Sequence, residues 1–167
     1  MPEAIIVAGA NGAGKTTFAR QLLPALHPDV EFLNVDELQF EDVAFSHPVA
    51  AGRELLRRLA DRERLRQSFA LETTLSSTMY RRRIQGWRAL GYHVYLHFIQ
   101  VPSEDFAVQR VAMRVAAGGH SVPESDVRRR YHRGLALLAQ VYKPIVDEWY
   151  HWYSDAGGIR FGQRQGK

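Results

Sequence analysis

The chain contains no cysteine, only three lysines and no long apolar run. The absence of cysteine excludes disulfide bonds and thiolate metal ligands, so we expect no structural zinc centre. The longest apolar stretches, "EAIIVAGA" and "YHVYLHFIQV", are far shorter than the roughly 20 residues of a membrane-spanning helix. The N-terminus also lacks a basic and then apolar leader, so we expect a cytoplasmic protein with no membrane segment.

Internal repeats and low-complexity linkers are lacking too, and 167 residues suit one domain that buries its own core. Hydrophobic residues make up 46% and charged residues 24% of the chain, as in ordinary globular proteins. The formal net charge of +4 comes almost entirely from arginine, whose planar side chain suits phosphate and carboxylate groups. An anionic ligand is therefore compatible with the composition, although the composition alone does not require one.

Apolar runs and amphipathic stretches alternate along the chain. We expect strands at 3–8, 31–35, 68–72 and 92–101, helices at 14–27, 48–67, 76–90, 103–117 and 123–142, and a last strand, turn and short return over 148–162. Pro24 is expected to kink or end the first helix, and Ser76 or Ser77 to cap the third. The pattern predicts a mostly parallel sheet of about five strands with helices on both faces.

The segment after the first strand, Gly9-Ala10-Asn11-Gly12-Ala13-Gly14-Lys15-Thr16, matches G-x-x-x-x-G-K-[ST] at every fixed position. It lies between an apolar strand and a helix, as this pattern requires. In such a loop, backbone N–H groups converge on phosphate oxygens and the lysine reaches the β- and γ-phosphates. We predict a nucleoside triphosphate site, with the Thr16 hydroxyl on Mg²⁺, whose residues are Gly9, Asn11, Gly12, Ala13, Gly14, Lys15, Thr16 and Thr17.

A dinucleotide loop, G-x-G-x-x-G with an acid about 20 residues later, is the main alternative, and Asp36 could supply the acid. The spacing rejects it. A pattern that starts at Gly9 meets Asn11 where it needs glycine, and one that starts at Gly12 meets Thr17. A glycine-rich turn without a ligand is the other alternative.

Two carboxylates follow expected strands. Asp36 comes directly after "FLNV", and Glu72 comes directly after "FAL". Because the carboxyl ends of neighbouring parallel strands share one edge, both acids could face the phosphate loop. A kinase needs a carboxylate to accept the hydroxyl proton and ligands for Mg²⁺, so we expect Asp36 and Glu72 to share these tasks. Which of the two is the base stays open, and a helix N-cap or a surface position is the alternative for each.

An arginine-rich segment around 110–130 surrounds a glycine hinge at Gly118 and Gly119. We expect a mobile lid that closes over the triphosphate, where cationic side chains neutralise charge and exclude water. For the three consecutive arginines at 128–130 a solvated face is the favoured interpretation, and at most one or two can face a ligand. The candidate phosphate contacts are Arg110, Arg114, His120 and Arg128.

With these motifs the chain resembles the zeta toxin family of P-loop kinases, in the compact chromosomal branch often described as ABC-type ATPases. The similar segments are "GANGAGKTT", "FLNVDE", "FALETTLS" and "RVAMRVAAGGHSVPESDVRRRYHRGL". The resemblance covers nearly the whole chain. It implies a P-loop NTPase-like α/β/α fold, one kinase domain over 1–167, and phosphorylation of the amino sugar of UDP-N-acetylglucosamine with ATP and Mg²⁺.

The resemblance also implies residue roles and a partner. Lys15 and Thr16 serve ATP and Mg²⁺, Asp36 is the catalytic base, and Arg110 or Arg114 is the first phosphate-clamping arginine. The second clamp does not map cleanly, so His120 or Arg128 is the candidate for it. Glu72, Thr73 and Thr74 lie on the acceptor or metal side. A protein antitoxin is a further partner that the family implies.

Two other functions stay open. A P-loop ATPase or nucleotide switch that moves a protein partner would share the same loop. The sequence pI of about 9.6 and the aromatic residues of "EWYHWY" raise nucleic-acid binding. Alternating aromatics in a last strand are more often core, or a wall near the adenine, so a nucleic-acid partner is not expected.

Overall fold

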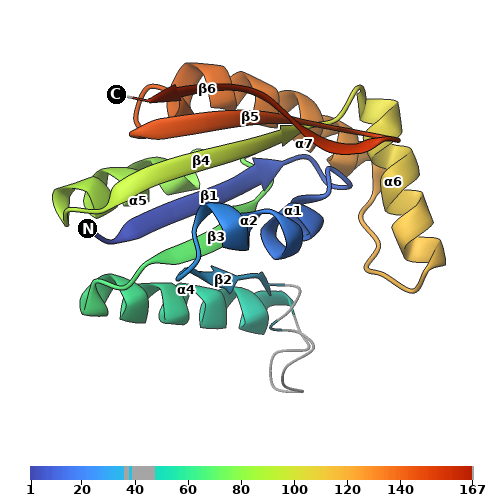
Figure 1. Cartoon of the computed structure of the whole chain (residues 1–167). Helices are drawn as coiled ribbons and strands as arrows, with labels where there is room; N and C mark the ends of the chain where they lie inside the picture. The colour runs from blue at the N-terminus through green and yellow to red at the C-terminus, as the bar shows by residue number, and fades with distance from the viewer. Residues whose placement is uncertain (36–37, 39–47, 167) are drawn as a thin grey trace.

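The computed structural model describes residues 1–35, 38 and 48–166, which form a six-stranded sheet with helices on both faces (Figure 1). The elements in chain order are β1 (Glu3–Gly9), α1 (Lys15–Gln21), α2 (Leu23–Leu26), β2 (Glu31–Leu33), α4 (Pro48–Leu65), β3 (Phe69–Thr73), α5 (Met79–Ala89), β4 (His93–Gln100), α6 (Glu104–Ala116), α7 (Glu124–Leu137), the π-helical turn η2 (Leu138–Tyr142), β5 (Glu148–Asp155) and β6 (Gly158–Gly166). The expected α/β fold with a mostly parallel sheet is confirmed.

The strands lie in the order β2-β3-β1-β4-β5-β6, and only β6 runs antiparallel to its neighbour among the described strands. β1 is central, because β3 pairs with one of its edges and β4 with the other. Val7 of β1 therefore lies level with Glu72 of β3 and His97 of β4. The expected short return after the Gly157-Gly158 turn is a nine-residue strand instead. Its length was underestimated because β6 is mostly exposed and has no apolar residue after Phe161.

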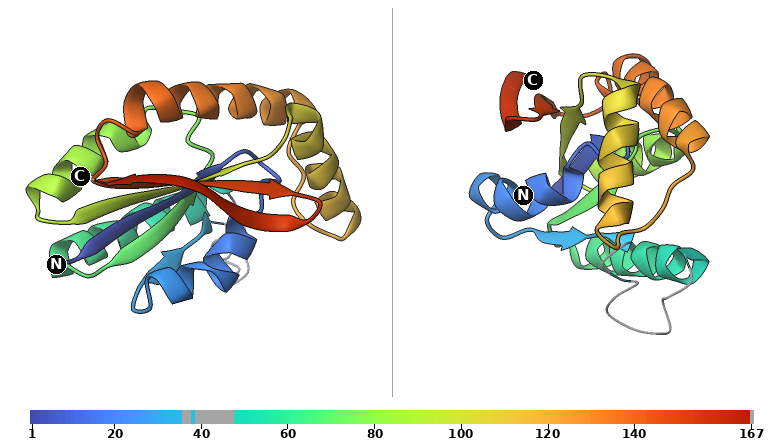
Figure 2. Two further views of the ribbon diagram at one scale, coloured as in Figure 1. Left: turned by 45° about the horizontal axis from the view of Figure 1, so that its top comes forward. Right: turned by 90° about the vertical axis from the view of Figure 1, so that its right-hand side faces the viewer.

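Both faces of β1 are buried. Ile6 points to the face where Leu59 of α4 and Trp87 of α5 pack, and Ile5 points to the face where Phe18 of α1 packs. Figure 2 shows α1 and α2 on one side of the sheet and α4 and α5 on the other. A strand buried on both faces reads as a continuous apolar run, which is the pattern of "AIIVA".

The first helix is interrupted where expected. α1 ends at Gln21, and Pro24 lies at the start of α2, where a proline without an N–H is tolerated. The expected cap of α5 was wrong, because α5 begins after Thr78. Ser76 and Ser77 belong instead to a loop that is held by contacts of its own, described below.

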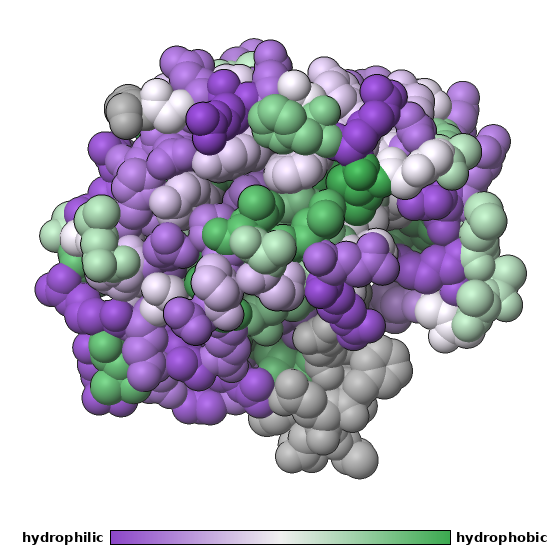
Figure 3. All heavy atoms as spheres, viewed as in Figure 1, coloured by the Kyte–Doolittle hydropathy of each residue, from purple (hydrophilic) through white to green (hydrophobic). Residues whose placement is uncertain are grey.

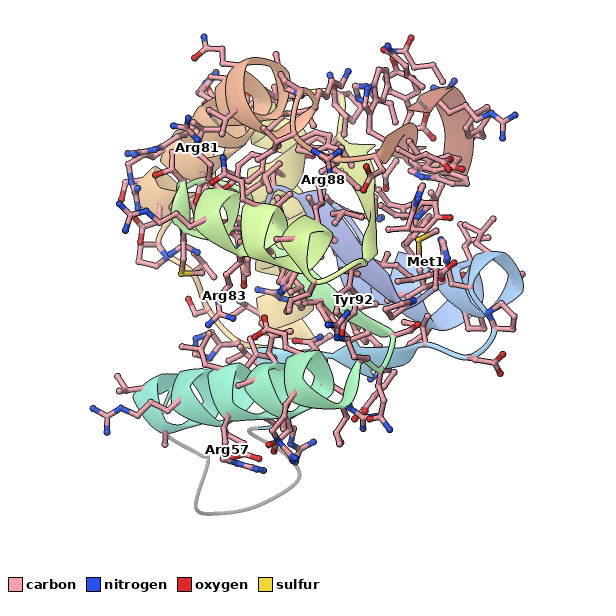
Figure 4. The ribbon with its side chains drawn as sticks, turned by 90° about the vertical axis from the view of Figure 1, so that its left-hand side faces the viewer. Met1, Arg57, Arg81, Arg83, Arg88 and Tyr92 are labelled. Carbon is pink, nitrogen blue, oxygen red and sulfur yellow. The ribbon has the colours of Figure 1, made fainter. Side chains whose placement is uncertain are left out.

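Arginines of α4 and α5 lie at the surface of the molecule (Figure 4), and several of them make ion pairs. Arg83 lies between the two helices and meets Glu63 of α4 at 3.1 Å. Arg57 lies on the outer side of α4, where Glu54 and Asp61 of the same helix bind it. Exposed pairs of this kind contribute about 0–1 kcal/mol each, so these arginines are explained by the helix surface.

One face of the molecule carries an apolar area. Figure 3 shows it near the middle of an otherwise mostly hydrophilic surface. The large apolar side chains exposed in this protein include Leu26 of α2 and Phe161 of β6. No described helix is long and apolar enough to cross a membrane.

Candidate functional site

The loop between β1 and α1 forms a tight turn at the carboxyl edge of the sheet. Gly12 and Gly14 have φ values of +78° and +89°, which favour glycine. A Cβ at Gly12 would lie 2.8 Å from the carbonyl oxygen of Ala107 of α6, and one at Gly9 would overlap the carbonyl oxygen of Ile99. The backbone at Gly9 and Gly12 therefore lies so close to β4 and α6 that a side chain at either position would overlap their carbonyl groups.

Lys15 and Thr16 begin α1 at the end of this loop. Lys15 is buried, and its ammonium group donates to the carbonyl oxygen of Ala10 at 2.9 Å. Thr16 donates through its hydroxyl to Oε2 of Glu72 at 3.0 Å. The helix N-terminus adds positive potential at the same place, so the site suits an anion.

Glu72 is the group that connects the loop to the neighbouring strands. Its carboxylate also lies 3.7 Å from the ammonium of Lys15 and accepts from the amide of Asn34 at 3.3 Å. Asn34 follows β2, and Glu72 lies near the end of β3, so neighbouring parallel strands do bring these groups to one edge. Glu72 therefore lies against the end of the phosphate loop, as we expected from its place after the third strand.

A cavity of about 430 Å³ opens beside these groups. Ligand sites commonly have volumes of about 300–1,000 Å³. The cavity is lined mostly by polar residues from four parts of the chain: Asn11 and Lys15, Asn34 and Val35, Glu72 to Thr74, and the segment from Arg114 to Arg130. Lining residues of the last group are Arg114, His120, Ser121, Val122, Pro123, Asp126 and Arg130.

Arg114 and His120 both reach the cavity. Arg114, in the last turn of α6, donates to the carbonyl oxygen of His120 at 3.0 Å, while its buried Nε has no hydrogen-bond partner. Gly119 makes this geometry possible, because a Cβ there would lie 2.6 Å from Cγ of Arg114. The glycines of "AAGGH" thus fold the chain back over the arginine.

Arg110 and Arg128 do not line this cavity. Arg110 lies over the ring of Phe106 at 5.5 Å, close to the backbone of Gly12. Arg128 forms ion pairs with Asp105 at 2.7 Å and Glu124 at 2.8 Å, and these hydrogen bonds raise the pKa of its guanidinium. The acids around Arg128 hold it between α6 and α7, away from the cavity.

Arg130 is the one cationic residue among the cavity residues that were not selected from the sequence, which also include Asn34, Ser121 and Asp126. It approaches Oδ1 of Asn11 in the phosphate loop at 3.4 Å and Asp126 at 3.8 Å. Sequence reasoning showed that one or two of three consecutive arginines could face a ligand but could not say which. The helical phase could have helped, because Val127 of α7 is buried and Arg130, three residues later, shares its face.

The remaining predicted residues are spread around the site. Thr73 and Thr74 line the cavity, Ala13 is buried within the loop, and Thr17 is exposed. Asp36 lies outside the described residues, although Asn34 and Val35 before it both line the cavity.

The aromatic residues of the last two strands are divided between core and surface: Trp152 of β5 is buried, whereas Tyr153 of β5 and Phe161 of β6 are exposed. Trp152 of β5 packs edge-on against Phe18 and donates through its indole N–H to Nδ1 of His97 at 3.2 Å. Burial, with His27 beside it, lowers the pKa of His97 to about 3. His27 in turn contacts His97 at 3.2 Å and Glu3 at 2.9 Å. These rings fix the helix α1 that begins at the phosphate loop.

The donor set near the loop fits Mg²⁺. Thr16 offers a hydroxyl oxygen and Glu72 a carboxylate oxygen, which are hard ligands. Among the described residues, no group of three or more His, Asp or Glu side chains is placed to hold a metal on its own. Mg²⁺ is commonly held by one or two protein oxygens together with phosphate oxygens and water, so this small set is compatible with it.

Comparison with known sequences gives a family match and a relative. The family model AAA_33, described as "AAA domain", matches residues 5–136. A protein of Haemophilus influenzae described as uncharacterized is 26% identical over 134 residues, which are 77% of this chain and 92% of that protein.

Solved structures share the fold at low identity. The PezAT chromosomal toxin-antitoxin system of Streptococcus pneumoniae matches with a TM-score of 0.65 and 18% identity, over 92% of this chain and 68% of that one. AvrRxo1-ORF1:-ORF2 with ATP matches with a TM-score of 0.74 and 17% identity, over 98% of this chain but only 58% of that one. A gluconokinase from Sinorhizobium meliloti 1021 matches with a TM-score of 0.55 and 18% identity, over 91% and 82%.

Proposed function

Because the chain belongs to the AAA domain family AAA_33 and has a kinase-like P-loop fold, we propose that it is an enzyme. The proposed activity is the ATP-dependent transfer of a phosphate group. The acceptor is a hydroxyl of a small anionic molecule, and UDP-N-acetylglucosamine is the leading candidate. The observation that carries the proposal is the cavity lined by Lys15, Glu72, Arg114 and Arg130, beside which Glu72 also accepts from the hydroxyl of Thr16.

The loop and α1 hold the donor. Backbone N–H groups of the loop and the Lys15 ammonium bind the β- and γ-phosphates, as the glycine cradle and the burial of Lys15 support. The Thr16 hydroxyl and the Glu72 carboxylate hold Mg²⁺. When bound, Mg²⁺ supplies positive charge that neutralises the phosphate oxygens.

The acceptor side uses the ends of β2 and β3. Thr73 and Thr74 offer hydroxyl groups to the acceptor, and Asp36 accepts the proton of its attacking hydroxyl. The acceptor oxygen forms a bond to the γ-phosphorus, the bond from that phosphorus to the β,γ-bridging oxygen breaks, and ADP leaves. The role of Asp36 rests on its position directly after two cavity residues, Asn34 and Val35.

Arg114 and Arg130 act on the phosphates from the α6 and α7 side. Their guanidinium groups neutralise the charge on the transferring group, and the 430 Å³ cavity allows them to approach a bound triphosphate. We assign the second clamping role to Arg130 in place of Arg128, because Arg128 is held by Asp105 and Glu124.

The test is incubation of the purified protein with ATP, Mg²⁺ and a set of sugar nucleotides, followed by mass spectrometry. We expect one phosphate added to UDP-N-acetylglucosamine, loss of product in Lys15→Ala, and loss of transfer with retained ATP binding in Asp36→Asn. Arg57→Ala on the outer side of α4 is the matched control. ATP hydrolysis at one rate with and without every acceptor would contradict the proposal and favour a nucleotide switch.

A second protein is a further part of the proposal. The PezAT structure is described as a toxin-antitoxin system, and the AvrRxo1 structure is described by two open reading frames, ORF1 and ORF2. We propose a cytoplasmic antitoxin partner for this chain on that basis. Growth arrest on expression, relieved by a neighbouring open reading frame, tests it, and normal growth under strong expression contradicts it.

A further inference from the structure

The loop after β3 lies against helix α7 at an unusually short distance. We call residues 74–77 the acceptor loop, because Thr74 lines the cavity on the acceptor side. Gly134 of α7 is buried, and a Cβ there would lie 2.9 Å from the carbonyl oxygen of Thr74. Real Cβ atoms essentially never approach another atom within 3.0 Å, so only glycine permits this contact.

The backbone conformation gives no other reason for glycine at this position. Gly134 lies inside a helix and is not among the residues with positive φ. Glycine inside a helix is less stable than alanine, because it loses more conformational freedom on folding. The close contact between α7 and the acceptor loop therefore explains why residue 134 is a glycine.

The acceptor loop is held from other sides as well. Tyr142, in the π-helical turn after α7, donates through its hydroxyl to the carbonyl oxygen of Ser77. Leu75 is fully buried at a φ of +56°, and its N–H donates to the hydroxyl of Thr73 at 3.1 Å. A buried leucine with positive φ is uncommon, and such conformations persist where the surroundings fix them.

α7 also carries Arg130, which lies four residues, about one helical turn, before Gly134. Residues four apart share a helix face. One face of α7 thus presents Arg130 to Asn11 of the phosphate loop and Gly134 to the acceptor loop. The helix connects the two sides of the cavity.

We propose that Gly134 is a positioning residue, which seats the acceptor loop on α7 and so fixes the distance between the phosphate-binding arginine and the acceptor. This inference rests on the proposed function. Because one helix contacts both sides, a triphosphate that draws in Arg130 also fixes the acceptor loop. Binding of the two substrates is therefore coupled through α7.

Hydrogen exchange tests the contact without any acceptor. We expect the amides of residues 73–78 to exchange faster in Gly134→Ala than in the wild type. ATP with Mg²⁺ should slow their exchange in the wild type but not in Gly134→Ala. Gly86→Ala on α5 is the matched control, since an added Cβ there meets no atom within 4 Å. Exchange in Gly134→Ala equal to that of the wild type and of Gly86→Ala would overturn the proposal.

Kinetics test the consequence for the reaction with UDP-N-acetylglucosamine. A displacement of a fraction of an ångström should raise the KM of the acceptor about tenfold, while the Kd of ATP stays within about twofold. Tyr142→Phe, which removes only the hydroxyl contact with Ser77, should act in the same direction. An equal rise in the Kd of ATP and the KM of the acceptor would refute a positioning role and indicate general loosening.

The two proposals fail in different ways. If the wild type transfers no phosphate to any acceptor, but ATP slows exchange of the acceptor loop in the wild type and not in Gly134→Ala, the proposed function is wrong and the coupling through Gly134 stands. If transfer occurs but Gly134→Ala matches Gly86→Ala in exchange and in KM, the coupling is wrong and the function stands.

Discussion

Replacement of Glu72 by glutamine is expected to strengthen the binding of ATP in the absence of Mg²⁺. The carboxylate lies 3.7 Å from the ammonium of Lys15 and 3.0 Å from the hydroxyl of Thr16. These are the two groups that we assign to phosphate and metal. A triphosphate that binds without metal must therefore bind beside the negatively charged Glu72 carboxylate, which already contacts both Lys15 and Thr16.

The size of the effect follows from the geometry. A phosphate oxygen bound to Lys15 would lie about 5 Å from the carboxylate, and two unit charges at that distance repel by about 3 kcal/mol at an effective dielectric constant of about 20. The Glu72 side chain is 17% exposed, so solvent reduces this energy. A net effect of about 1.4 kcal/mol corresponds to about tenfold in Kd.

Isothermal titration calorimetry with ATP, in EDTA and in excess Mg²⁺, measures the change. For Glu72→Gln we expect the metal-free Kd to fall about tenfold and the enhancement by Mg²⁺ to shrink by at least the same factor. Glu148→Gln, at the start of β5 and the opposite edge of the sheet, is the control. A metal-free Kd equal to that of the wild type would refute the reasoning, because the carboxylate would then not face the phosphates.

Three further outcomes are expected. In steady-state kinetics, Arg130→Ala should lower kcat about 100-fold, while Arg128→Ala should change kcat less than about threefold. A larger loss in Arg128→Ala would instead favour Arg128, the candidate from the sequence, as the second phosphate contact. Gly12→Ala should abolish nucleotide binding in a folded protein, because a Cβ at this positive φ lies 2.8 Å from a carbonyl oxygen, and retained binding of ATP would contradict the cradle. Burial lowers the pKa of His97 to about 3 from 6.5, so between these values the unfolded chain binds a proton that the folded chain does not. The free energy of unfolding should fall as pH falls through this window, by up to about 1.4 kcal/mol per unit, and urea denaturation of His97→Phe should lack this part of the slope.

The sequence was sufficient for the fold and the phosphate loop because both depend on local patterns. Apolar runs of four to six residues, interrupted by glycine and proline, predict strands and helices wherever the strands are buried on both faces. The loop at residues 9–16 needs only fixed spacing and a strand before it. The length of β6 was underestimated for the same reason, because the strand is mostly exposed and its second half, after Phe161, has no apolar residue.

The arginines could not be assigned in the same way. Arg128 and Arg130 are alike in sequence, and the difference lies in neighbours that are distant along the chain: Asp105 beside one and Asn11 beside the other. Gly134 had no signal in the sequence for a similar reason. A glycine inside a helix shows its purpose only when the carbonyl group opposite is known.

The central position of β1 has a consequence during synthesis. The strand that leads into the phosphate loop pairs with residues 69–73 on one edge and with residues 93–99 on the other. The ribosome must therefore release the chain as far as residue 99 before β1 has both of its neighbours. Until then β1 can pair with β3 alone, and its other edge exposes unpaired backbone groups beside the apolar stretch "AIIVAG".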